Sequence, residues 1–292
     1  MEAVAPACVA QRTVSVLVNE EIARETYRIR LADPDMARVI IPGQFLMIRG
    51  RGAETLLGRP FAIYDVARDA AGTPYALDVV YQVVGRGTAA LASHRPGDQV
   101  TVWGPLGNGF GPAPDGPVVF VGGGIGQTPF LALGKWWLGR ESFGDSQLHE
   151  PAHMGRYATS ATLLYGVRTA AMAAGVPDFE RAGIPVELAT DDGSKGHHGF
   201  VTQLLEQRLA RGDRPAKVIG CGPPPMLAAL SRLVERHGLD CDLSLENHMA
   251  CGFGACFSCV APIRQADGST DLRRVCVEGP IFPASTVVWS AH

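Results

Sequence analysis

The stretch PVVFVGGGIGQTP, residues 117–129, decides the fold. It begins as an unbroken apolar run, typical of a strand buried on both faces, and the helix-compatible segment PFLALGKWWLG follows at 129–139. Glycines between a strand and a helix let backbone N–H groups approach a pyrophosphate group. The turn is a variant of G-x-G-x-x-G in which Gln127 occupies the third slot. Taken alone, it is compatible with a dinucleotide site or with tight packing of the helix against the strand.

Three more strands of the buried type follow along the chain. They are ATLLYGVRT (161–169), IPVELATDDG (184–193) and AKVIGCGPPPM (216–226). Helical patterns lie at 200–212 and 226–238, between or after these strands. Alternating strands and helices predict a doubly wound parallel sheet, which we assign to a domain of residues 114–240. The polar, aperiodic segment 140–160 is expected to be an exposed loop inserted after the first helix.

Acidic residues and a thiol stand at the ends of the later strands, where parallel sheets bind their ligands. Asp191 and Asp192 follow the third strand, and their carboxylates accept hydrogen bonds from ribose hydroxyls but repel a 2′-phosphate, which favours NAD over NADP. Cys221 lies between two glycines where a nicotinamide ring could lie flat. A solvated acidic turn and a small buried residue stay open as alternatives. The candidate nucleotide-binding residues are Gly122, Gly123, Gly124, Gly126, Thr128, Asp192, Cys221 and Gly222.

The chain before the glycine turn has a different pattern. Six short β-rich runs separated by turn signals fill residues 13–110, with little helical pattern between them. They predict an antiparallel six-strand barrel or sandwich over residues 1–113. The segment GPAPDGP (111–117) forms the linker to the next domain.

Two turns in this N-terminal domain suit a phosphate group. Arg59 precedes a proline and an aromatic strand, and its guanidinium group offers a planar fork to phosphate oxygens. Further along, Gly85, Gly87 and Thr88 end another strand just before a helical turn, where backbone N–H groups can meet a second phosphate. A buried arginine ion pair and an ordinary strand-to-helix turn are the alternatives.

In this order, the motifs RPFA (59–62), GRGT (85–88), GGGIGQTP (122–129) and CGPPPM (221–226) resemble those of the ferredoxin–NADP reductase superfamily. The resemblance covers about residues 10–235 and implies FAD in the barrel, with the nicotinamide of NAD against the flavin. Ala62 departs from the family, which usually has Ser or Thr there with its hydroxyl near the flavin N5. The residues that the resemblance places along FAD are Arg59, Pro60, Phe61, Ala62, Val80, Tyr81 and Gln82, with Gly87 and Thr88 on the pyrophosphate.

The composition is that of an ordinary globular protein, with 46% hydrophobic and 19% charged residues. A net charge of −3 without a basic stripe argues against a nucleic-acid partner. The N-terminus has no secretory pattern and no apolar run approaches the length of a membrane span, so we expect a cytoplasmic protein that does not enter the membrane. No Ser-His-Asp set or carboxylate pair stands out, so no catalytic side chain is assigned and the chemistry is expected to belong to cofactors.

From residue 241 onward the chain is neither helical nor alternating, and it carries cysteines in the pattern C-x4-C-x2-C-x16-C. This is the known plant-type [2Fe–2S] spacing, and the small residues in the loop leave N–H groups free to donate to sulfur. The candidate metal ligands are Cys251, Cys256, Cys259 and Cys276. Zinc is the rival, although its usual pattern pairs two C-x2-C knuckles and this segment has one. Free thiols stay open, and a disulfide is disfavoured in the cytoplasm.

The segments LSLENHMACGFGACFSCV (243–260) and RRVCVEGPIF (273–282) are similar to those of the electron-transfer subunits of NAD-dependent dihydroorotate dehydrogenase. The resemblance implies that all four cysteines hold the cluster in a segment of residues 241–292. It also implies a partner, the FMN-containing catalytic subunit, in a heterotetramer. Electrons would pass from that FMN through [2Fe–2S] and FAD to NAD+ in pyrimidine biosynthesis. The alternatives are a flavin and iron–sulfur reductase that serves a ferredoxin-type or sulfide-type acceptor, and a redox-sensing module.

Overall fold

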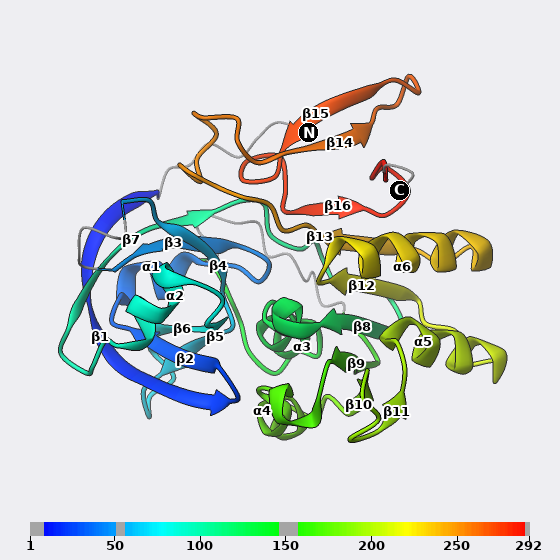
Figure 1. Ribbon diagram of the computed structural model, residues 1–292, viewed down its shortest axis with the longest axis horizontal. Helices are drawn as coiled ribbons and strands as arrows, with labels where there is room; N and C mark the ends of the chain where they lie inside the picture. Colours follow the sequence, from blue (N-terminus) through cyan, green and yellow to red (C-terminus); the bar gives the residue numbers. More distant parts are fainter. Residues whose placement is uncertain (1–8, 51–55, 146–156, 290–292) are drawn as a thin grey trace.

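The computed structural model describes residues 9–50, 56–145 and 157–289. Two seven-stranded sheets lie side by side, an antiparallel one from the N-terminal part of the chain and a largely parallel one from the rest (Figure 1). The predicted pairing of an antiparallel barrel with a doubly wound sheet is confirmed. The loop expected at 140–160 lies partly outside the described residues. Within the described ranges, no helix has the length and apolar character needed to cross a bilayer.

The antiparallel sheet has the strand order β4-β3-β7-β1-β2-β6-β5. Its strands are β1 (Ala10–Ala23), β2 (Thr26–Leu31), β3 (Phe45–Arg49), β4 (Arg59–Ala62), β5 (Asp65–Arg68), β6 (Pro74–Gln82) and β7 (Gln99–Leu106). Two short helices accompany it, α1 (Pro34–Val39) and α2 (Arg86–Ala92). The edge strands β4 and β5 follow each other in the chain, so the sheet must curl until its two edges meet.

This sheet has seven strands where the sequence pattern predicted six. The fourth predicted run breaks after Ala62, because Ile63 N–H donates to the Gln44 carbonyl (3.2 Å) while Tyr64 N–H donates to the Asp78 carbonyl (2.9 Å). Between these two residues the chain leaves the β3 side of the barrel and joins the β6 side. Both are 1% exposed, so the apolar pattern continues through the break and hides it.

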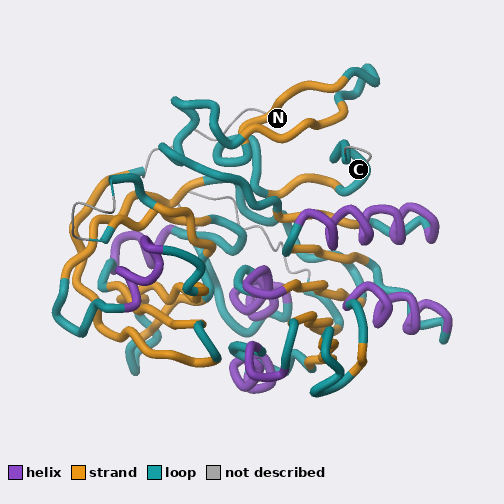
Figure 2. The backbone as a smooth tube through the Cα atoms, viewed as in Figure 1, coloured by secondary structure: helices purple, strands orange, loops and turns teal. Residues whose placement is uncertain are grey.

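The second sheet has the order β11-β10-β9-β8-β12-β13-β16, and its last pairing, β13 with β16, is antiparallel. Its strands are β8 (Pro117–Gly123), β9 (Ser160–Val167), β10 (Val186–Thr190), β11 (His197–His198), β12 (Lys217–Cys221), β13 (Cys241–Ser244) and β16 (Ile281–Pro283). One face is covered by α3 (Phe130–Trp137) and α4 (Val176–Arg181) and the other by α5 (Val201–Ala210) and α6 (Pro224–His237), as Figure 2 shows in purple. Helices on both faces explain why these strands are apolar throughout.

The helix after the glycine turn begins within one residue of the segment that the sequence pattern indicated. Residues Gly124–Gln127 form a 3₁₀ turn, η1, and α3 starts at Phe130. Nearly every side chain of α3 is buried, and the Phe130 ring stacks on Phe120 of β8 with centroids 5.0 Å apart. The helix α3, which follows this turn, therefore packs tightly against β8.

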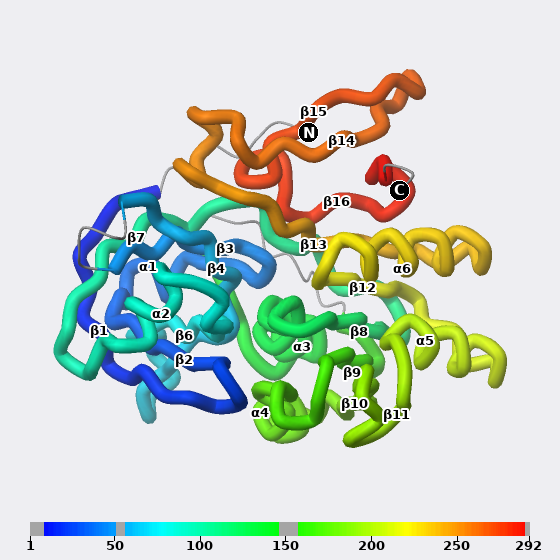
Figure 3. Tube along the Cα trace, in the orientation of Figure 1, coloured from blue at the N-terminus to red at the C-terminus, as the bar shows by residue number. Residues whose placement is uncertain are grey.

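The C-terminal part of the chain joins both sheets. β13 and β16 extend the parallel sheet, while β14 (Val260–Arg264) and β15 (Thr270–Arg274) form a separate hairpin. Between β13 and β14 the chain is a loop that carries three of the four clustered cysteines. Figure 3 shows this part, orange to red, lying along one side of both the barrel and the parallel sheet. Because the sheet continues beyond residue 241, the division at 113 and 240 stays a proposal.

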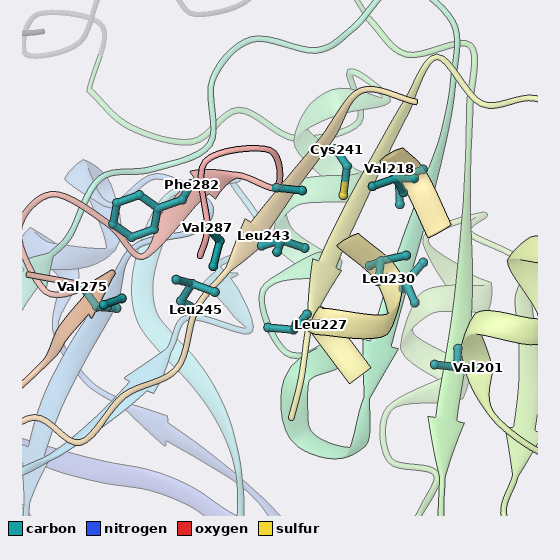
Figure 4. Packing of buried hydrophobic residues seen from close by; sticks show 14 of the residues in the cluster. Val201, Val218, Leu227, Leu230, Cys241, Leu243, Leu245, Val275, Phe282 and Val287 are labelled. Atoms are coloured by element: carbon teal, nitrogen blue, oxygen red, sulfur yellow. The ribbon is translucent and has the colours of Figure 1, made fainter. Parts of the chain in front are cut away.

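A continuous apolar core anchors the C-terminal part. Leu243 of β13, Leu230 of α6 and Phe282 of β16 belong to one buried cluster, part of which is shown in Figure 4. The same cluster includes Met47 and Leu106 of the barrel. The C-terminal part that carries the cysteine loop therefore makes buried contacts with both sheets.

Candidate functional site

A cleft of about 760 Å³ opens between the barrel, the parallel sheet and the loop after β13. Its volume is in the range of sites that hold cofactor-sized molecules. The residues that the sequence assigned to FAD all line it: Arg59, Pro60, Phe61, Ala62, Val80, Tyr81, Gln82, Gly87 and Thr88. Residues from two separate strands, β4 and β6, and from helix α2 therefore converge on one place.

Arg59 and the turn before α2 lie against each other on one wall. Nη1 of Arg59 donates to the carbonyl groups of Leu57 (2.9 Å) and Gly58 (3.2 Å). Nε and Nη2 point the other way, 3.7 and 3.8 Å from where a Cβ on Gly87 would stand. A guanidinium group beside the N–H groups of a first helical turn is suited to a diphosphate.

Thr88 shapes this turn through its side chain. Its Oγ1 accepts hydrogen bonds from the N–H groups of Val84 (2.9 Å) and Gly85 (3.2 Å), and the hydroxyl donates to the Gly85 carbonyl (3.0 Å). The hydroxyl is thus committed inside the loop. A phosphate at this turn would meet the backbone N–H of Thr88 instead.

Thr128 and Cys221 from the parallel sheet line the opposite wall of the cleft. The glycine turn touches β12 here, because a Cβ at Gly126 would lie 2.4 Å from the Cys221 carbonyl oxygen. Burial, and to a lesser degree the charge of Glu246, raises the pKa of the Cys221 thiol well above its usual value. The Cys221 thiol is therefore held in its neutral form.

The remaining residues predicted for the nucleotide do not line the cleft. Asp192 is exposed in the turn after β10, where its Oδ1 accepts hydrogen bonds from the hydroxyl (2.6 Å) and the N–H (3.0 Å) of Ser194. These bonds hold the pKa of Asp192 below its usual value, so the carboxylate is charged at neutral pH. The others lie in the glycine turn or directly after β12: Gly122, Gly123, Gly124, Gly126 and Gly222.

Sequence reasoning missed residues 244–249, which form a wall of the cleft. Ser244 ends β13, which runs parallel to β12, so this loop leaves the sheet at the same edge as Cys221. The rule that parallel sheets bind ligands at this edge would have indicated the loop, had β13 been recognised as a strand. Within it, Glu246 Oε1 lies 4.0 Å from Cys221 Sγ. The carboxyl is exposed to the cleft, yet the surrounding protein desolvates it and raises its pKa.

The structure brings the four predicted metal ligands together. The Cys256 thiol interacts with that of Cys251, and the Cys276 thiol interacts with those of Cys259 and Cys251. Cys259 and Cys276 form a buried pair, at 1% and 2% exposure, whereas Cys256 is exposed and Cys251 is partly exposed. One pair therefore lies inside the protein and the other faces its surface.

Two thiol pairs match the donor set of a two-iron cluster, which takes four cysteines. In the part of the chain that the structure describes, no three His, Cys, Asp or Glu side chains converge on a single ion. The spacing of these four cysteines is what favours a two-iron cluster over one zinc ion. Ser258 Oγ, 3.2 Å from Cys256 Sγ, lowers the pKa of that exposed thiol to about 6, while burial raises the pKa of Cys276 to about 12.

Arg274 ties the turn of the fourth cysteine to the loop of the other three. Its Nη2 and Nε bind the Glu278 carboxylate at 2.9 and 3.2 Å. Its Nη1 donates to the Gly254 carbonyl (3.3 Å), and the guanidinium carbon lies 4.9 Å from the centre of the Phe257 ring. An ion pair therefore lies beside the cysteine loop.

Comparison with known proteins agrees with this geometry. The family model described as the iron–sulfur cluster binding domain of dihydroorotate dehydrogenase B matches residues 246–288, a range that includes all four cysteines. The dihydroorotate dehydrogenase B (NAD(+)) electron transfer subunit of Desulforamulus reducens is 33% identical over 276 residues, 94% of this chain and 97% of the relative. That of Enterococcus faecalis V583 is 35% identical over 285 residues, 95% of this chain and 98% of the relative.

This chain belongs to the family of dihydroorotate dehydrogenase B electron transfer subunits. The resemblance seen in the cysteine segment is confirmed, and with it the presence of an iron–sulfur domain. Among solved structures, an NADH-dependent reduced ferredoxin–NADP oxidoreductase aligns at a TM-score of 0.76 and 24% identity, over 94% of this chain and 90% of that one. A cytochrome P450 reductase of Amycolatopsis aligns at 0.60 and 25%, over 78% and 66%. The electron transfer subunit family thus shares the reductase fold.

Proposed function

We propose that this chain takes electrons from the reduced FMN of a dihydroorotate dehydrogenase catalytic subunit and delivers them to NAD+ in pyrimidine biosynthesis, using its own [2Fe–2S] cluster and FAD. One observation carries the proposal: residues 244–249 line the cleft, and Cys251 lies two positions further on. A cluster at the four cysteines and a flavin in the cleft would therefore share one loop, which supports electron transfer between them.

FAD occupies the cleft, held by residues of the barrel. Arg59 and the N–H groups of Gly87 and Thr88 bind its diphosphate, while Tyr81 and Ala62 line the flavin ring. Ala62 has no hydroxyl, so hydrogen bonds to the ring at this position come from the backbone. When bound, FAD exchanges the single electrons of an iron–sulfur cluster for the hydride that nicotinamide accepts.

NAD binds at the edge of the parallel sheet, with its diphosphate over the glycine turn. Cys221 and Thr128 receive the nicotinamide on the wall opposite Ala62, because they line the same cleft. Asp192, charged at neutral pH, accepts hydrogen bonds from the adenosine ribose and repels a 2′-phosphate. The chain therefore uses NAD in preference to NADP.

The FMN-containing catalytic subunit docks on the face of the cysteine loop. Cys256 is exposed there, and so are Phe253 (57% exposed) and Phe257 (59% exposed), which flank it in the sequence. Aromatic side chains in the open are typical of protein interfaces. We place the complex in the cytoplasm as a heterotetramer, with residues 1–113, 114–240 and 241–292 of this chain as FAD, NAD and cluster domains.

The test is the replacement Cys276→Ser in the complex with the catalytic subunit. Loss of one ligand of the buried pair should abolish iron and sulfide binding and dihydroorotate-dependent NAD+ reduction. FAD content and dye reduction by NADH should persist, because the cleft is untouched. Wild-type protein that binds neither FAD nor iron and sulfide after anaerobic reconstitution would refute the proposal, as would undiminished NAD+ reduction by the variant.

A further inference from the structure

Trp103 of β7 reaches the cysteine loop from the barrel. Its indole Nε1–H donates to the backbone carbonyl of Cys251 at 2.8 Å, between residues 148 positions apart in the chain. The side chain is partly buried, so water competes with this bond only in part. The bond therefore ties the main chain of one predicted cluster ligand directly to the barrel.

The same indole ring also packs on the turn that leads to Arg59. A Cβ at Gly58 would lie 2.3 Å from Cη2 and 2.9 Å from Cζ2 of Trp103, so the ring occupies the space that any other residue at position 58 would need. Gly58 directly precedes β4, whose residues line the cleft. One side chain thus contacts both the cysteine loop and the approach to the flavin wall.

A second contact from the barrel supports the first. Met47 of β3 stands opposite both Trp103 on β7 and Pro60 on β4 in the sheet register. A Cβ at Gly252 would lie 2.7 Å from Met47 Cγ, so the loop packs directly on this side chain. The loop therefore packs on neighbouring positions of two strands, β3 and β7, and Trp103 adds a directional hydrogen bond there.

We propose that Trp103 is a positioning residue that fixes the distance between the iron–sulfur cluster and the flavin. Its N–H holds the cluster loop, and its ring packs against Gly58, which directly precedes the strand that lines the flavin cleft. Electron transfer between two redox groups slows steeply as their separation grows, so a loop that shifts away from the barrel transfers electrons more slowly. The inference rests on the proposed function, which places the cluster at the four cysteines and FAD in the cleft.

The experiment compares Trp103→Phe with wild-type protein that carries FAD and cluster. Phenylalanine keeps an aromatic ring near Gly58 but removes the N–H. After mixing with NADH, the flavin should be reduced at the wild-type rate, since the nicotinamide wall is unchanged, and the cluster should then be reduced more slowly. Hydrogen exchange of the amides at 251–254 should rise by about two- to tenfold, the factor that corresponds to the net worth of one hydrogen bond.

Trp289→Phe is the matched control. The Trp289 indole N–H donates to Ser231 Oγ at 2.9 Å, so this variant also loses one indole hydrogen bond in the C-terminal part, away from the cysteine loop. It should leave both the exchange at 251–254 and the rate of cluster reduction unchanged. Equal effects of the two variants would overturn the proposal.

Replacement of Trp103 by benzothienylalanine, which keeps the bicyclic shape and removes only the N–H, covers the case in which Trp103→Phe does not retain its cluster. It should reproduce the slower cluster reduction with full iron and sulfide content. If the benzothienylalanine variant reduced its cluster at the wild-type rate and showed wild-type hydrogen exchange at 251–254, the inference would be overturned and the proposed function would be left intact. Absence of cluster or flavin from wild-type protein would instead refute the proposed function. Hydrogen exchange of the amides at 251–254 would still test whether Trp103 holds the cysteine loop.

Discussion

Arg59 shows how much of this site is determined by the surroundings of single residues. Two backbone carbonyls hold one end of its guanidinium group, and the Gly87 turn lies beside the other. The fork is therefore oriented before any ligand arrives, which reduces the entropy lost on binding. Its sequence context indicated a phosphate ligand, but only the fold shows that the second phosphate-type turn stands next to it.

Arg59→Ala should weaken FAD binding by about 1.5–3 kcal/mol, the usual worth of hydrogen bonds to a charged group. Titration of flavin-free protein with FAD, followed by flavin fluorescence, measures the change. The exposed Arg38 offers a control, since Arg38→Ala removes the same charge away from the cleft. An unchanged dissociation constant for Arg59→Ala would contradict the assignment of Arg59 to the diphosphate.

The ion pair beside the cysteines should set the reduction potential of the cluster. Glu278→Gln keeps hydrogen-bonding atoms for Arg274 but removes a negative charge, so the potential should rise. Arg274→Gln removes the positive charge and should lower it. An electrochemical titration followed by electron paramagnetic resonance measures both, with iron content as the control for cluster retention. Shifts of the same sign in the two variants would contradict an electrostatic origin.

At the scale of the element, the turn that meets the diphosphate depends on the placement of α2. Asn19 of β1 holds the far end of this helix, because its Nδ2 donates to the carbonyls of Leu91 and His94, each at 3.0 Å. Its Oδ1 accepts a hydrogen bond from the Tyr81 hydroxyl (3.0 Å). These carbonyls lie at the end of the helix and just after it, where few intrahelical donors remain, and the Leu91 carbonyl also accepts from the N–H of His94 (3.2 Å).

Asn19→Ala should lower the free energy of unfolding by about 1–3 kcal/mol, because it removes the hydrogen bonds to the Leu91 and His94 carbonyls and the one from the Tyr81 hydroxyl. Urea unfolding followed by circular dichroism measures this loss. Tyr81→Phe serves as a graded comparison, since it removes one bond to Asn19 and should cost only about 1 kcal/mol. If Asn19→Ala cost no more than Tyr81→Phe, the bonds to α2 would contribute nothing.

Other elements show where sequence patterns succeed. The strands β8, β9, β10 and β12 and the helices α5 and α6 appear where the periodicity predicted them, since each carries a strong local pattern. β13 and β16 were missed, because such short strands lack a clear pattern and form through pairing with β12 and with each other. The wall at 244–249 was missed for the same reason.

At the scale of the whole molecule, polar contacts hold the barrel against the parallel sheet behind the cleft. Lys135 Nζ of α3 lies 2.6 Å from Asp65 Oδ2 of β5, and the Tyr64 hydroxyl donates to Asp178 Oδ2 of α4 at 2.8 Å. Burial raises the pKa of Asp65 to about 6. The ammonium group of Lys135 lowers this pKa, but by less than desolvation raises it. These two contacts, the seam between barrel and parallel sheet, maintain the orientation of the two walls that face each other across the cleft.

The seam makes stability depend on pH. The folded pKa of Asp65 lies above its unfolded value, so the native state binds the extra proton, and the resulting stability is lost as pH rises through about 6. From pH 5 to pH 7.5 the loss should be about 1 kcal/mol. Urea unfolding at both pH values measures it. The Asp65→Asn variant has no titrating proton at position 65, so its stability should change less between the two pH values than that of the wild type. An equal change in both proteins would argue against Asp65 as the cause.

Local chemistry in the chain determined the cofactor types of this protein. The spacing C-x4-C-x2-C and the glycine turn at 122–126 act over a few covalently linked residues, so they can be read without the fold. Only the tertiary structure decided that the cysteines form a buried pair and an exposed pair, that Asp192 stands away from the cleft, and that Trp103 joins the cysteine loop to the barrel. These relations depend on contacts between residues far apart in the chain, which packing establishes and no local pattern encodes.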